Sequence, residues 1–194
     1  MLPFNPYLFS VFPSFRLSVL PDFRLIPYIG ATNFCRMPID HKARFLHEAF
    51  VPLLQTIPST TAPLWGKMNL QQMIEHFGDA VRMSSGRLPA PRLLTPEESL
   101  PKMQAFMFSD KPFKENTANP LMPETPAPVR FISIEAAINE LDAQLDHFFA
   151  VFKANPSFST LNPFFGVLDY EGNVQLLYKH AVHHLRQFGV EVAG

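Results

Sequence analysis

Two histidines near the C-terminus have a spacing that suits a metal ion. His180 and His184 lie four residues apart within the segment KHAVHHLRQFG of residues 179–189. Residues four apart on a helix are stacked neighbours, so both rings can direct a nitrogen to one point, whereas His183 is turned away. A third ligand must come from another segment, and His76 is the best candidate because it lies beside an apolar stripe in a helix-like stretch. The sequence therefore predicts a metal site formed by His76, His180 and His184.

Such a site has a definite chemistry. Three neutral imidazoles can bind a divalent transition metal, with bonds of about 2.0 to 2.1 Å for zinc, and leave a fourth position to water or substrate. A metal held in this way can polarise a substrate oxygen, generate hydroxide near neutral pH or hold a thiol as its thiolate. The spacing alone leaves an alternative open, in which His180 and His184 only pack at the edge of a bundle with satisfied hydrogen bonds. Histidine suits zinc, nickel, copper and iron alike, so the pattern does not identify the metal.

Three polar residues are candidates to support these ligands. Asp79 follows His76 by three residues and could orient its ring, because ligating histidines usually donate their other ring nitrogen to an acceptor; an ordinary solvated carboxylate is the alternative. Gln187 lies on nearly the same helical face as His180, so we predict that it forms a hydrogen bond in the cavity. His183 is expected to be exposed or to support the site from outside the ligand set.

The aromatic residues Trp65, Phe164 and Phe165 could form the wall of an apolar pocket beside the metal. With 20 phenylalanines in the chain, a place in the hydrophobic core is the alternative interpretation. No other catalytic signature competes, because the sequence has no glycine-rich phosphate loop, no Gly-x-Ser-x-Gly elbow and no His-Glu-x-x-His motif. Cys35, the only cysteine, is a poor nucleophile candidate, and any metal here would rely on histidine.

Four amphipathic segments must position these residues. Apolar residues recur at three- and four-residue steps over residues 40–56, 69–85, 134–152 and 170–188, which predicts four helices. No stretch alternates convincingly as a strand does. We therefore predict an all-α fold, a four-helix bundle in which a long proline-rich crossover over residues 86–130 joins the second and third helices.

Two segments lie outside this repeating pattern. Within the crossover, Thr95-Pro96-Glu97-Glu98 has a capping-box pattern that predicts one or two helical turns before Phe108. Residues 1–36 mix prolines with phenylalanines and keep no period, which is typical of a poorly ordered extension and points to a mis-assigned start upstream of Met37; a hydrophobic arm docked on the domain or on a partner is the other interpretation. The folded domain is expected to cover residues 37–194.

Composition limits the class of protein. The net charge of −1 and the absence of a basic run disfavour nucleic acid as a partner. Hydrophobic residues make up 47% and charged residues 17% of the chain, which is typical of a globular protein, and no apolar run approaches the roughly 20 residues that span a bilayer. A single cysteine fits a reducing compartment, so we expect a soluble, cytoplasmic protein of one domain.

Taken together, these motifs resemble the DinB-like (DinB/YfiT-like) superfamily of metal-dependent four-helix-bundle proteins. The resemblance rests on a histidine that ends the segment WGKMNLQQMIEH of residues 65–76 and on the last-helix pattern H-x-x-H-H-x-R-Q of residues 180–187. The phrases NPFFG and HHLRQFG, at residues 162–166 and 183–189, resemble an uncharacterised branch of it, a domain family of unknown function. The likeness covers residues 38–190.

The resemblance implies a metal triad at His76, His180 and His184 that binds zinc or nickel. Characterised relatives include transferases and isomerases that use a low-molecular-weight thiol, namely bacillithiol, mycothiol or glutathione. We therefore expect a thiol-dependent transferase or a metal-dependent hydrolase that acts on a small molecule. A non-catalytic bundle, stabilised by a metal or used to bind a ligand, is the alternative. Homodimers are common in the superfamily, so the resemblance also favours a homodimer.

Overall fold

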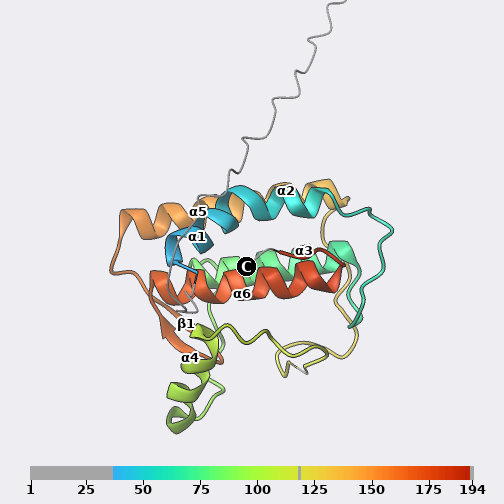
Figure 1. The fold of residues 1–194 in the computed structure, drawn as a ribbon. Helices are drawn as coiled ribbons and strands as arrows, with labels where there is room; N and C mark the ends of the chain where they lie inside the picture. The colour runs from blue at the N-terminus through green and yellow to red at the C-terminus, as the bar shows by residue number, and fades with distance from the viewer. Residues whose placement is uncertain (1–36, 118, 193–194) are drawn as a thin grey trace, which may run out of the picture. The chain divides into compact units, whose positions relative to one another are not determined.

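The computed structural model describes residues 37–117 and 119–192, and this part of the chain is mostly helical, as predicted. The elements, drawn in Figure 1, are α1 (Ile39–Arg44), the π-helix η1 (Phe45–Ala49), α2 (Phe50–Gln55), α3 (Leu70–Ser84), the 3-10 helix η2 (Glu97–Ser99), α4 (Leu100–Phe108), α5 (Ile134–Ala154), β1 (Thr160–Asn162), β2 (Gly166–Leu168) and α6 (Tyr170–Gln187). The extension predicted for residues 1–36, together with Cys35, lies outside the described residues. Within the described ranges, every helix is either too short or too polar to span a lipid bilayer.

The first predicted helix, over residues 40–56, consists of α1, η1 and α2 in direct succession. Pro52 accounts for the π-helix between the two α-helices, because proline has no N–H and its ring clashes with the carbonyl group four residues earlier, here that of Glu48. The wider π turn comes just before this position, where the N–H of Phe50 donates to the carbonyl group of Phe45. The helix therefore continues through the proline instead of breaking.

The helix that carries His76, α3, begins and ends at local signals. Asn69 and Gln72 form a capping box, in which the Asn69 side chain accepts from the Gln72 N–H at 2.9 Å and the Gln72 side chain accepts from the Asn69 N–H at 3.0 Å. Beyond Ser84, Gly86 has a φ of 78°, in the left-handed region that glycine adopts without strain. These two ends confirm the predicted second helix and determine where His76 lies along it.

The helices α5 and α6 also begin at side-chain caps. Ser133 Oγ accepts from the N–H of Ala136 at 3.2 Å, and Asp169 Oδ1 accepts from the N–H of Gly172 at 2.9 Å. Each cap satisfies one of the N–H groups that the first turn of a helix leaves without a partner. Both helices are confirmed, and α6 carries the two histidines with the predicted spacing.

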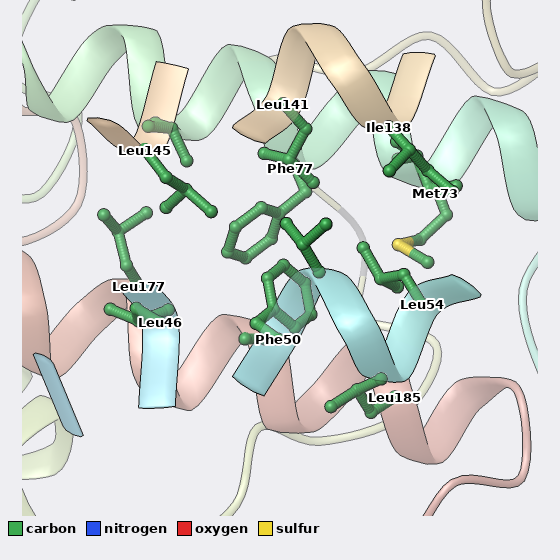
Figure 2. Packing of buried hydrophobic residues seen from close by; sticks show 14 of the residues in the cluster. Leu46, Phe50, Leu54, Met73, Phe77, Ile138, Leu141, Leu145, Leu177 and Leu185 are labelled. Atoms are coloured by element: carbon green, nitrogen blue, oxygen red, sulfur yellow. The ribbon is translucent and has the colours of Figure 1, made fainter. Parts of the chain in front are cut away.

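The main hydrophobic core lies between these helices. α3 packs against α5 and α6, α2 packs against α5, and α1 and η1 pack against α6. Figure 2 shows the rings of Phe50 and Phe77 side by side within this core. Their centroids are 4.6 Å apart and their planes are tilted by 55°. The other labelled side chains in Figure 2 are Leu46, Leu54, Met73, Ile138, Leu141, Leu145, Leu177 and Leu185. The core therefore holds α3 against α6, the two helices with the candidate ligands.

The connection between α3 and α5 contains η2 and α4, and α4 packs against α6 through a second, smaller core. The buried residues of this second core are Met107, Phe165, Leu168 and Leu176. The short helix was predicted, but its cap was predicted wrongly. The Thr95 hydroxyl donates to the Phe164 carbonyl group at 2.9 Å, and Pro96, which precedes η2, makes no side-chain cap. A neighbouring segment thus holds this turn in place of a local cap.

A short antiparallel hairpin of β1 and β2 precedes α6, although no stretch of the sequence alternates convincingly as a strand does. Asn162 pairs with Gly166, and Asn162 Oδ1 accepts from the N–H groups of Phe164 and Phe165 at 2.9 and 3.2 Å. Strands of three residues are too short to show the alternation by which a strand is recognised in a sequence.

Candidate metal centre

Three imidazole rings from α3 and α6 meet at the predicted positions. His180 Nε2 lies 3.3 Å from His76 Nε2 and 2.7 Å from His184 Nε2. One ring nitrogen of each residue lies within 4.8 Å of those of the other two. We term these three residues the histidine cluster. Its members lie close enough together to bind one metal ion.

Gln187 determines which nitrogen of His184 carries the proton. The Trp65 carbonyl group can only accept, so the amide group that lies 2.7 Å from it is the Gln187 NH2, and the Gln187 oxygen faces His184. That oxygen lies 2.8 Å from His184 Nδ1, which must therefore be protonated and donate. This tautomer leaves the lone pair of His184 Nε2 directed into the cluster, as a metal ligand requires.

Gly66 leaves the space in which this contact forms. Its φ is 78°, and a Cβ atom at this position would lie 2.8 Å from Gln187 Nε2. The Leu64 N–H also donates to the Gln187 carbonyl group at 2.7 Å. Both the backbone conformation and the available space therefore favour glycine beside Trp65, in a turn that holds Gln187 at the end of α6.

Burial keeps the histidine cluster neutral. The pKa values of His180 and His184 lie well below the ordinary value, first because burial penalises the charged ring and then because the neighbouring imidazoles repel its charge. Burial also lowers the pKa of His76, while the Asp79 carboxylate acts in the opposite direction. The neutral imidazole is the form that binds a metal, so the cluster does not need to lose a charge first.

The donor set fits a divalent transition metal. Two nitrogens bound to one tetrahedral zinc at about 2.0 to 2.1 Å lie about 3.3 to 3.4 Å apart, and the Nε2 atoms of His76 and His180 are 3.3 Å apart. The 2.7 Å between His180 and His184 is a hydrogen-bond length, so a proton shared by these two rings is the competing interpretation. The approach of the third ring, that of His76, favours the metal, because a shared proton needs only two nitrogens.

Asp79 does not make the contact predicted for it. Its Oδ1 accepts from Arg82 at 2.5 Å and from Arg130 at 3.0 Å, and within the described ranges it has no hydrogen bond to His76. The prediction missed Arg130 because this residue lies at the far end of the proline-rich connection. Asp79 therefore acts on the His76 ring through its charge alone.

The other predicted site residues lie in two different places. The ring of His183 packs between Trp65 and Phe113, at centroid distances of 5.6 and 6.0 Å, and is not a member of the histidine cluster. Phe165 is buried in the second core, and Phe164 packs against it. Of the three predicted pocket walls, Trp65 is the one whose contacts reach the cluster, through Gln187.

Two further neighbours of the cluster were not identified from the sequence. The Phe113 ring, from the connection after α4, lies 6.4 Å from the His180 ring. Lys179 is buried, and its Nζ donates to the carbonyl groups of Phe106 and Ser109 at 3.1 and 2.7 Å. A phenylalanine in a proline-rich segment and a lysine beside a histidine carry no local signal of such contacts.

Comparisons with models of known protein families, with curated proteins and with solved structures found no match. The geometry and the chemistry of the histidine cluster are therefore the observations that bear on function.

Proposed function

We propose that this chain is a DinB-like four-helix bundle, built from α1–α2, α3, α5 and α6, that binds a divalent metal at His76, His180 and His184. The connection over residues 86–130 would be the crossover of this bundle. The observation that carries the proposal is the approach of three neutral imidazoles to one point, with the tautomer of His184 fixed by Gln187. Zinc and nickel are the metals that the resemblance implies, and three imidazole nitrogens suit both.

The activity that we propose is a transfer reaction of a low-molecular-weight thiol, with metal-dependent hydrolysis as the second reaction open to such a site. When bound, a divalent metal with three protein ligands supplies a Lewis acid that lowers the pKa of a thiol or a water in its fourth position. The protein holds the three ligands neutral and buries His184, which is 4% exposed. His183, which is not in the cluster and whose ring centroid lies 5.3 Å from that of His184, is the imidazole that we propose accepts the released proton.

Metal analysis tests the site directly. We expect about one equivalent of metal in purified wild-type protein, as for other three-histidine sites, and its loss in His76→Ala, His180→Ala and His184→Ala, each checked for helicity by circular dichroism. His183→Ala is the matched control, because it removes a neighbouring imidazole of α6 that is not in the cluster. A wild-type protein that stays free of metal after reconstitution would contradict the proposal, as would equal loss of metal in the control.

A reaction screen tests the catalytic part. Metal-loaded protein would be incubated with bacillithiol, mycothiol or glutathione and a panel of electrophiles, and separately with ester and amide substrates. Thiol-dependent product formation that requires the metal supports the transferase. Persistent inactivity, together with spectroscopic detection of a fourth protein ligand on the metal, would exclude both reactions because no position would be open to a substrate.

A second function, a non-catalytic bundle stabilised by its metal, is favoured by the distribution of the ligands over two helices. His76 lies on α3, whereas the other two ligands lie on α6, so one ion would cross-link these helices. Binding to the folded state alone adds directly to its stability. Removal of the ion by a chelator should therefore lower Tm, and the two functions differ in whether its removal also abolishes a metal-dependent activity.

A further inference from the structure

Residues 109–117, which we term the strap, leave the end of α4 and continue beside α6 (Figure 1). Phe113 is the half-buried aromatic side chain of this segment. Its ring lies edge-on to His180 and His183, at centroid distances of 6.4 and 6.0 Å. Phe77 of α3 also contacts His180, at 5.2 Å. Aromatic rings from α3 and from the strap therefore both contact His180, the member of the cluster whose Nε2 lies close to the Nε2 atoms of both others.

Lys179 holds the first part of the strap on α6. Its Nζ donates to the carbonyl groups of Phe106 at 3.1 Å and Ser109 at 2.7 Å, and also to that of Lys111. The last carbonyl groups of a helix lack intrahelical partners and carry partial negative charge, so the end of α4 attracts an ammonium group. Because Lys179 directly precedes His180, the anchor of the strap and a candidate ligand are neighbours on α6.

Asn116 makes the contact at the other end of the strap. Its φ of 52° is in the left-handed region that asparagine tolerates, and its Oδ1 accepts from the Gly66 N–H at 3.1 Å. This exposed hydrogen bond joins the strap to the turn that orients Gln187. In the same turn, the Trp65 indole N–H is buried and has no protein partner within the described ranges.

We propose that the strap restricts access to the histidine cluster, whose members His76 and His180 are half-buried, and that a ligand reaches the cluster faster when the strap lifts. Phe113 is the side chain that covers His180, Lys179 is a positioning residue that holds the strap at α4, and Asn116 is the end that detaches first. Lys179 makes three partly buried hydrogen bonds, whereas Asn116 makes one exposed hydrogen bond, so the strap pivots at its α4 end. The role in metal exchange rests on the proposed metal site, whereas the covering of His180 does not.

The test compares the access rates of a small reagent in matched variants of the full chain. Phe113→Ala removes the covering ring, Lys179→Met removes the donor at nearly constant length, and Asn116→Gly keeps the left-handed backbone but removes the acceptor. Phe149→Ala is the control, because this half-buried phenylalanine of α5 packs against the main core and not against the strap. Two rates are measured: zinc transfer to a coloured chelator from loaded protein, and carbethoxylation of His180 by diethyl pyrocarbonate in metal-free protein, followed by mass spectrometry.

We expect Phe113→Ala and Lys179→Met to raise both rates by about tenfold or more, since a half-buried phenylalanine ring contributes on the order of the 1.4 kcal/mol to which a factor of ten corresponds. Lys179→Arg keeps the donors and should return the rates toward the wild-type values, which a loss of packing alone would not explain. Asn116→Gly should raise the rates by a smaller factor. Rates within about twofold of wild type for Phe113→Ala and Lys179→Met would overturn the proposal, because a twofold change is well below the expected tenfold increase. An equal increase in Phe149→Ala would also overturn it.

The two rates separate the failure of this proposal from that of the proposed function. If wild-type protein binds no zinc, the proposed function fails, and the carbethoxylation of His180 alone decides whether the strap covers the ring. If zinc binds but Phe113→Ala leaves both rates unchanged, the metal site stands and the strap proposal fails. Circular dichroism on each variant excludes unfolding as the cause of a faster reaction, and Asn116→Gly, a change at an exposed position, gives a second result if Lys179→Met does not fold.

Discussion

Replacement of Gln187 by methionine tests whether the orientation of His184 sets the affinity for metal. Methionine has a similar length but neither donates nor accepts as an amide does. The variant loses the 2.8 Å hydrogen bond to His184 Nδ1 and the 2.7 Å hydrogen bond to the Trp65 carbonyl group. The His184 proton is then free to move to Nε2, where it competes with the metal for the lone pair.

The structure sets the expected size of this effect. We expect the Kd for zinc to rise about 10- to 100-fold, the usual loss when a partner of a ligating histidine is removed, which corresponds to about 1.4 to 2.8 kcal/mol of binding free energy. Metal-free protein should also lose about 1 to 3 kcal/mol of unfolding free energy, because buried groups lose their partners. Chelator competition at fixed pH measures the Kd, and urea unfolding measures the stability.

Gln187→Glu separates the two hydrogen bonds. A carboxylate still accepts from His184 Nδ1 and makes that imidazole a better ligand, but it cannot donate to the Trp65 carbonyl group. We therefore expect zinc affinity at or above the wild-type value, with lower stability of the metal-free protein. Wild-type affinity in Gln187→Met would refute the reasoning, and equal weakening in both variants would assign the effect to the Trp65 contact instead of to the tautomer of His184.

Three further predictions follow from the same contacts. Gly66→Ala should weaken metal binding, because its Cβ would lie 2.8 Å from Gln187 Nε2, whereas Gly78→Ala, whose Cβ meets nothing within 4 Å, should raise the unfolding free energy by about 0.5 to 1 kcal/mol. Calorimetry measures the metal affinity and urea unfolding the stability, and wild-type metal affinity in Gly66→Ala would show that the turn is unimportant. Metal-free protein should lose stability as the pH falls below about 6.5. The pKa values of the histidine cluster are lowered in the folded chain, so below this pH the unfolded chain binds more protons than the folded chain. Equal urea midpoints at about pH 7 and pH 5.5 would contradict this prediction. Glu75→Ala should lower the unfolding free energy by about 1 to 3 kcal/mol, because the Arg130 N–H loses an acceptor at 2.8 Å, and an unchanged urea midpoint would contradict this role.

The sequence by itself determined the main helices and the pair of histidines on α6. The caps at Asn69 and Asp169 and the apolar periods depend on residues within a turn or two of one another, and such signals are present in any short segment. The spacing of His180 and His184 likewise belongs to one helix, so it predicts their proximity before any packing is known. His76 could also be selected, because it lies beside the apolar face by which α3 packs against its neighbours.

Only the tertiary structure decided what surrounds these ligands. Gln187 orients His184 because a turn far away in the sequence supplies the Trp65 carbonyl group, and Asp79 turns to Arg130 because the proline-rich connection returns to α3. The two short strands of the hairpin have no recognisable period in the sequence. The same is true of the strap that contacts His180. Their positions depend on how separate helices pack, and a pairing between distant residues leaves no repeated pattern in either segment from which it could be predicted.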